Sequence, residues 1–180
     1  KTLLIMSMLF VILAVLLFGV SVLLLFRREM LGPVAAFLAF GSVYLSGQLP
    51  MNVNMLVTWL CLTLVVTGVS ALQPVAVMSQ TRGMGYMSLG ALAGMIVGMM
   101  AYSLSHSLGF VYSMMCLGVL AGVFLGYLLF TRTPKGMELS MSRSRFFSYL
   151  LAKGFPVAVS AMMLGVVAIL YLFVTYTLPL

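Results

Sequence analysis

The chain has 180 residues, of which 64% are hydrophobic and 6% are charged, and its net charge is +7. Its mean hydropathy is +1.26, and a water-soluble domain of this length could not bury so much apolar surface. The composition therefore excludes a soluble protein and predicts an integral membrane protein. The apolar residues form continuous runs and do not alternate with polar ones, which favours helices over an outer-membrane barrel.

Six apolar runs follow one another along the chain, each close to the roughly 20 residues that a helix needs to cross a bilayer. They cover residues 3–26, 31–49, 52–73, 84–104, 108–130 and 149–177. We therefore expect an all-α, polytopic membrane protein with six transmembrane helices. The first run is too long for a signal peptide and has no small-residue cleavage site. We divide the chain into a five-span bundle, a basic cytoplasmic loop and a final transmembrane helix, at residues 1–130, 131–148 and 149–180.

The basic residues predict the orientation. Alternating the six spans places eight of them on one side and only Lys1 on the other. The eight are Arg27, Arg28, Arg82, Arg132, Lys135, Arg143, Arg145 and Lys153. The positive-inside rule then places both termini on the outer side and the basic loops in the cytoplasm. This topology accounts for the net charge, so we expect the lipid bilayer and no nucleic acid as a partner. We expect the protein in a bacterial inner (plasma) membrane.

A Pro-Val-Ala tripeptide begins at Pro33, Pro74 and Pro156, near the predicted cytoplasmic start of a span or its approach. Proline in the first turn of a helix loses no hydrogen bond, so the tripeptide can mark helix starts. It can also be the remnant of an internal repeat of the kind that many transporters have.

Polar residues gather in the third run. Asn52 and Asn54 stand at its outer start, and further hydroxyl side chains follow at Thr58, Thr63, Thr67 and Ser70. Such hydroxyls commonly bond back to carbonyls of their own helix or bridge to a neighbouring helix, and the alternative is that they line a water-filled path. Our candidates for a substrate path or a gate are therefore Asn52, Asn54 and Arg82.

Two glycine stripes occupy the fourth and fifth runs. They consist of Gly90, Gly94 and Gly98, and of Gly118, Gly122 and Gly126. Spacing of four residues puts the glycines of each run on one helix face, which lets another helix approach closely. We predict that these six glycines are helix-packing residues and that their two spans form a hairpin.

Residues for catalysis are scarce. The two carboxylates, Glu29 and Glu138, fall in predicted cytoplasmic loops, and the single histidine, His106, has no acidic partner nearby. The two cysteines, Cys61 and Cys116, lie in mid-span without a ligand-like spacing, which indicates packing residues. We therefore expect no enzyme, no metal site and no cofactor.

The stretch from Pro74 onwards resembles transporters of the major facilitator superfamily. The resemblance rests on Thr81-Arg82-Gly83-Met84-Gly85 before the first glycine stripe, on Gly109-Phe110, on Thr133-Pro134-Lys135, on the basic stretch from Arg143 to Lys153, and on Gly154-Phe155-Pro156. It implies that residues 84–130 correspond to the fifth and sixth helices of that family and residues 149–180 to the seventh. Six spans are half of the family's usual twelve, so the resemblance implies a partial chain or a half that dimerises. A first residue that is not Met also suggests trimming.

Two functions are compatible with this sequence. The first is a multi-pass transport protein that moves a small-molecule solute by alternating access, as the resemblance implies. The second is a non-catalytic scaffold or accessory subunit, whose glycine stripes would dock helices of other membrane subunits.

Overall fold

The computed structural model describes residues 2–27, 31–72, 83–105, 107–134 and 147–177. The described residues contain helices and no strand, which confirms the predicted all-α class. The helices are α1 (Thr2–Arg27), α2 (Leu31–Ser46), α3 (Val53–Ala71), α5 (Met84–Met99), α6 (Leu108–Thr131) and α9 (Phe155–Thr177). A 3₁₀-helical turn, η1 (Met100–Ser103), continues α5, and a π-helical turn, η2 (Leu150–Gly154), leads into α9.

Four helical stretches are long and apolar enough to cross a membrane. They are Met6–Leu24, Val53–Ala71, Leu108–Thr131 and Phe147–Thr175. The other two helices, α2 and α5, have 16 residues each. At 1.5 Å per residue, 16 residues extend about 24 Å, which is less than the hydrocarbon core of about 30 Å. The structure therefore supports a membrane protein, while the crossing of the membrane by all six helices stays a prediction.

Glycine and proline define several helix ends. Gly47 follows α2 with a φ of 66°, in the left-handed region where a side chain would be strained. Pro50 and the extended backbone of Asn52 then precede α3. Gly83 precedes α5 with a φ of 92°. Pro33 lies in the first turn of α2, where a helix tolerates its missing N–H. Pro74 lies outside the described residues.

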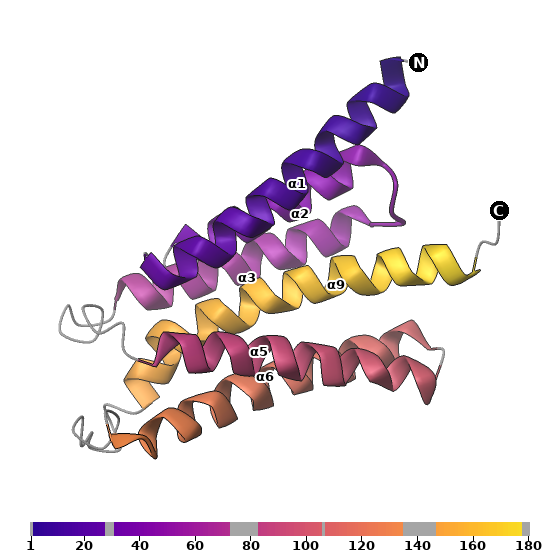
Figure 1. Cartoon of the computed structure of the whole chain (residues 1–180). Coiled ribbons are helices and arrows are strands. Elements are labelled where there is room, and N and C mark those ends of the chain that lie inside the picture. Colours follow the sequence, from indigo (N-terminus) through magenta and orange to yellow (C-terminus); the bar gives the residue numbers. More distant parts are fainter. Residues whose placement is uncertain (1, 28–30, 73–82, 106, 135–146, 178–180) are drawn as a thin grey trace.

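The helices run alternately up and down the molecule, with α9 in the middle (Figure 1). One group of helices is α1, α2 and α3, and a second group is the hairpin of α5 and α6. Helix α9 contacts all five of these helices. Among the described helices, the two groups touch each other directly in one place, where α1 contacts α5. All other contacts between the groups run through α9 and its π-helical turn. The final helix of the predicted topology is thus the central helix of the fold.

The core forms around α9. Val157, Met163 and Val166 of this helix are at most 3% exposed, and α9 packs closely where its side chains are small. A Cβ atom at Gly165 would collide with the side chain of Met115 in α6, and the side chain of Met95 in α5 also lies close to this Cβ position. Flexible methionine side chains fill such irregular contacts between helices well. The core therefore joins both helix groups to α9.

Candidate functional site at the start of the central helix

The glycine stripes of α5 and α6 lie directly against each other. A Cβ atom added at Gly90 would collide with the backbone of Gly122, and one added at Gly94 would collide with the backbone of Gly118. The reverse holds for Cβ atoms at Gly118 and Gly122. Because the obstacle on each side is backbone, no change of rotamer would make room for it. At these four positions the two helix backbones are in contact.

The same register extends to both ends of the hairpin. A Cβ atom at Gly98 would lie 2.5 Å from the Cα atom of Met115. At the other end, a Cβ atom at Gly126 would lie 2.9 Å from the carbonyl carbon of Tyr86. Each step of four residues up α5 thus matches a step of four residues back along α6. The structure brings all six glycines of the sequence prediction to this one interface.

Of the three predicted path residues, the structure describes Asn52 and Asn54. The side chains of Asn52 and Asn54 are exposed at the start of α3. Asn52 caps α3 with its backbone carbonyl, which accepts N–H bonds from Met55 and Leu56 at 3.0 and 3.3 Å, and its side chain makes no capping bond. Arg82 lies outside the described residues, so its proposed role stays a prediction.

Most hydroxyls of α3 bond to their own helix. Thr58, Thr63 and Thr67 each donate to the carbonyl four residues earlier, at 2.8 Å. Of the two readings of these residues, the structure shows local bonding. Ser70 differs, because its hydroxyl crosses to the carbonyl of Ala152 in the π-helical turn at 3.3 Å.

Pro156 explains both the π-helical turn and this cross-link. Proline has no N–H, so in an α-helix it would leave the carbonyl of Ala152, four residues earlier, without its donor. Here the preceding N–H, that of Phe155, bonds five residues back to Leu150, which is the π-helical pattern. Ser70 of α3 then supplies a donor to Ala152. Pro156 therefore does not start the helix, which runs through it from Phe147.

Lys153 lies within this turn and is completely buried. Its exposed fraction is 0%, and Tyr149, one turn before it, is 1% exposed. Tyr149 stacks on Tyr127 of α6, with ring centroids 5.1 Å apart, and Tyr127 in turn lies 6.4 Å from the ring of Phe130. Aromatic rings therefore pack between the start of this helix and α6, and the hydrogen bond of Ser70 connects the turn to α3. An ionisable side chain among membrane helices is costly and commonly functional.

The sequence prediction missed this site. Lys153 counted only as one of eight basic residues on the cytoplasmic side. The signal was a lysine and a proline within the same apolar run, because an internal proline frees a carbonyl and distorts the helix around it. A linear count of charges gives the end of the bundle at which a residue lies, but not how deeply it is buried.

An apolar groove lies near the opposite end of α9. Its volume is about 470 Å³, and α1, α2 and α9 form it. Val11, Phe18 and Leu164 contribute apolar walls, while Gln48 and Tyr171 add polar atoms near its end. Gln48 also makes a 3.4 Å hydrogen bond to Ser7 of α1. The groove lies between the first helix group and α9.

The part of the chain that the structure describes offers no cluster of three His, Cys, Asp or Glu side chains that could hold a metal ion. Cys61 is exposed and Cys116 is half-buried, and both are free thiols. Glu29, His106 and Glu138 lie outside the described residues. Comparison with known proteins gives no match to a family model, a curated protein or a solved structure.

Proposed function

We propose that the chain is a multi-pass membrane transport protein that moves a small solute by alternating access and catalyses no reaction. All six helices cross the bilayer in this proposal, with both termini on the outer side. The observation that carries it is the position of Lys153, fully buried on the helix that contacts both helix groups. A buried ionisable group between membrane helices is the usual mark of a solute or ion path.

The internal construction of the two groups supports this proposal. The backbone contact between the glycine stripes joins α5 and α6 into one tight unit. In the other group, Ser21 of α1 donates a 2.8 Å hydrogen bond to the carbonyl of Gly32 in α2. Alternating access requires two such units that rock about a site between them. Helix α9 occupies that position in this chain, in contact with both groups.

The distribution of charge supports the orientation. Arg27, at the end of α1, Arg132, at the end of α6, and Lys153 all lie at the end of the molecule opposite to the start of α1 (Figure 1). Basic residues concentrate on the cytoplasmic side of membrane proteins. In the proposed topology Asn52 and Asn54 then stand at the outer side, where they belong to the solute entrance or its gate.

Transport is tested with the purified chain reconstituted into liposomes. Entry of labelled sugars, amino acids and organic anions is measured against protein-free liposomes. Entry of at least one class above the protein-free level, and its loss in Lys153→Met, supports the proposal. Absence of flux for every class in the properly folded chain contradicts it.

The second candidate, a scaffold subunit of a larger membrane complex, has one observation in its favour. The apolar groove between α1, α2 and α9 has a volume of about 470 Å³, and only 11% of the apolar window of α1 is buried. The glycine stripes already cover each other, so a partner helix would use this groove. Purification in mild detergent separates the two functions, because a stable stoichiometric complex with other proteins favours the scaffold.

A further inference from the structure

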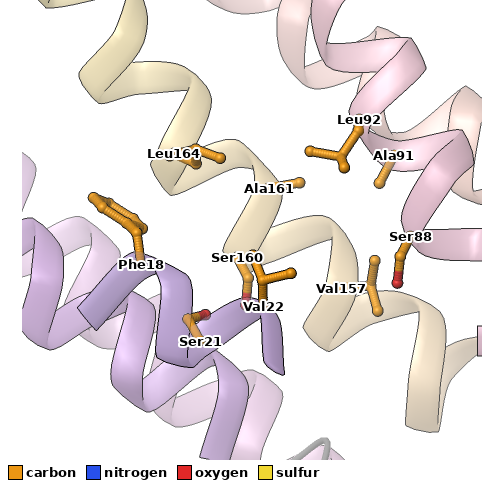
Figure 2. A pocket seen from close by; sticks show the side chains of 10 residues that line it. All are labelled: Phe18, Ser21, Val22, Ser88, Ala91, Leu92, Val157, Ser160, Ala161 and Leu164. Carbon is orange, nitrogen blue, oxygen red and sulfur yellow. The ribbon is translucent and has the colours of Figure 1, made fainter. Parts of the chain in front are cut away.

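A small cavity lies where α1, α5 and α9 meet, at the boundary between the two helix groups. Its volume is about 30 Å³. Figure 2 shows that α1 and α5 contribute side chains from different sides of α9, among them Ser21, Ser88 and Ser160. The remaining lining is apolar, with Val22 and Val157 as examples. Three serines from three helices thus line one cavity.

Two of these hydroxyls have no partner. Ser88 is 8% exposed and Ser160 is 5% exposed, and the Oγ atoms of both are buried without a hydrogen bond. Ser21 differs, since its hydroxyl donates to Gly32. A hydroxyl in a membrane helix normally bonds to a carbonyl of the preceding turn, as Ser42 does to Leu38 at 2.9 Å. The two hydroxyls therefore leave donors and acceptors for something in the cavity.

The cavity's size and lining define what fits. A buried water needs roughly 10–15 Å³ of this kind of space and two or more polar partners, so the cavity accepts one or two groups of that size. No charged side chain lines it, which gives an ion no counter-charge. A hard cation would also need about six oxygen ligands, more than three serines supply. The fitting ligand is a small, uncharged group that both donates and accepts hydrogen bonds.

We propose that this cavity is a hydrated site that binds such groups at Ser88 and at Ser160, either water or the hydroxyl of a solute. The site places hydrogen-bonding capacity between α5 and α9, one to two turns from Lys153 along α9. It holds water when no solute is bound, because a dry cavity would leave both hydroxyls unsatisfied. This inference does not depend on transport, since a scaffold subunit can hold the same site.

The test uses a thiol reagent that reacts with thiolates in contact with water. In a background with Cys61→Ala and Cys116→Ala, Ser88→Cys and Ser160→Cys are compared with Ser42→Cys. Ser42 is the matched control, because it is equally buried, at 7% exposed, and its hydroxyl bonds to its own helix. We expect modification of the two cavity cysteines at least about tenfold faster than that of the control, because thiolates form only where water reaches. Equal rates at all three positions would overturn the proposal.

A second arm checks that the hydroxyls attract the water. Adding Ser88→Ala to Ser160→Cys leaves Ser21, already bonded to Gly32, as the remaining hydroxyl of the lining, so the cavity holds water less well. The rate at Ser160→Cys should then fall towards that of the control, whereas an unchanged rate contradicts a role for Ser88. All variants must elute as monodisperse protein. If the cysteine variants do not, a high-resolution structure of the unmodified chain decides, by ordered density within hydrogen-bond distance of both hydroxyls or by its absence.

The same assay identifies the source of the ligand. Methanol serves as the probe, because it carries one neutral hydroxyl, has no charge and is small enough for the cavity. Slower modification of Ser160→Cys in methanol, with no change at an exposed cysteine such as Ser113→Cys, assigns the site to a solute hydroxyl. No protection assigns it to water. Transport assays of the same variants are scored separately, so a failure of transport does not affect this result.

Discussion

The hydroxyl of Ser70 on α3 lies 3.3 Å from the carbonyl oxygen of Ala152 and donates to it, across 82 residues of sequence. Ser70 is completely buried, and Pro156 has removed the N–H that would otherwise serve this carbonyl. A single hydrogen bond thus ties the first helix group to the π-helical turn that contains Lys153.

Ser70→Ala should lower the stability of the fold. The change leaves the carbonyl of Ala152 buried with one donor fewer, which costs about 1–3 kcal/mol. Thermal unfolding in detergent measures the effect as a lower Tm. Ser113→Ala is the control, because Ser113 is exposed and bonds to its own helix, and it should change the Tm little. Equal effects of the two substitutions would show that the contact from α3 contributes nothing.

Pro156→Ala should reduce the contribution of Ser70 to the stability of the fold. An alanine at this position restores a backbone N–H within reach of the carbonyls of the turn, so Ala152 no longer depends on α3. In a double-mutant cycle, Ser70→Ala should cost less in the Pro156→Ala background than in the unmodified chain, by about 0.5–1.5 kcal/mol. Additive effects would mean that the proline and the serine act independently.

Gly94→Ala and Gly122→Ala should loosen the α5–α6 hairpin. Each new methyl group meets backbone of the opposite helix, so the helices must separate, and overpacking of this kind costs about 1–3 kcal/mol. Gly85→Ala is the matched control within α5, because nothing lies within 4 Å of its added Cβ. That control should be neutral or stabilising, since alanine favours the helix by up to about 1 kcal/mol. Thermal unfolding of the three variants measures the effect, and the Tm of Gly94→Ala and Gly122→Ala should lie below that of Gly85→Ala.

Lys153→Met should abolish transport and preserve the fold. Methionine keeps a flexible, largely apolar side chain that fills the same space, and it leaves no ionisable group buried at this position. Uptake into liposomes and the Tm are measured on the same preparation. Arg132→Met, at an exposed arginine near the same end, should retain transport. A large loss of Tm in Lys153→Met would instead identify Lys153 as a structural residue.

The proposed sidedness is tested with single cysteines. Gln48→Cys, between α2 and α3, should react with a membrane-impermeant reagent in intact cells. Thr133→Cys, just after α6, should react only after the membrane is opened, because the positive-inside rule places it in the cytoplasm. Both are made in the background without Cys61 and Cys116. Labelling of both positions in intact cells would refute the alternating topology.

The sequence allowed the helices to be predicted, because each helix boundary has a local cause. The run predicted at 52–73 is α3 at Val53–Ala71, and the run predicted at 108–130 is α6 at Leu108–Thr131. Composition decides that such runs are helical in a membrane, and residues such as Gly47 and Pro50 end or precede them. These signals act over a few residues and need no knowledge of the partner helix.

The burial of Lys153 and the central place of α9 could not be predicted in this way. Both depend on which helices meet in three dimensions, and the described apolar helices differ little in polarity from one face to another. The sequence of α9 therefore does not distinguish it from a helix at the lipid boundary. The pairing of Gly90 with Gly122 was easier to foresee, because the spacing of small residues marks a contact face.

The position of α9 also sets an order of events during synthesis. The helices α1 to α3 and the α5–α6 hairpin emerge from the ribosome before α9, and among the described helices they share one direct contact, between α1 and α5. Within each group, helices that are neighbours in the sequence contact each other. The two groups, in contrast, are joined by a helix that is synthesised after both of them. Contacts of such long sequence separation form slowly. We therefore expect the newly made chain to pass through a stage in which two small helix assemblies have formed and the segment that unites them is still to be added.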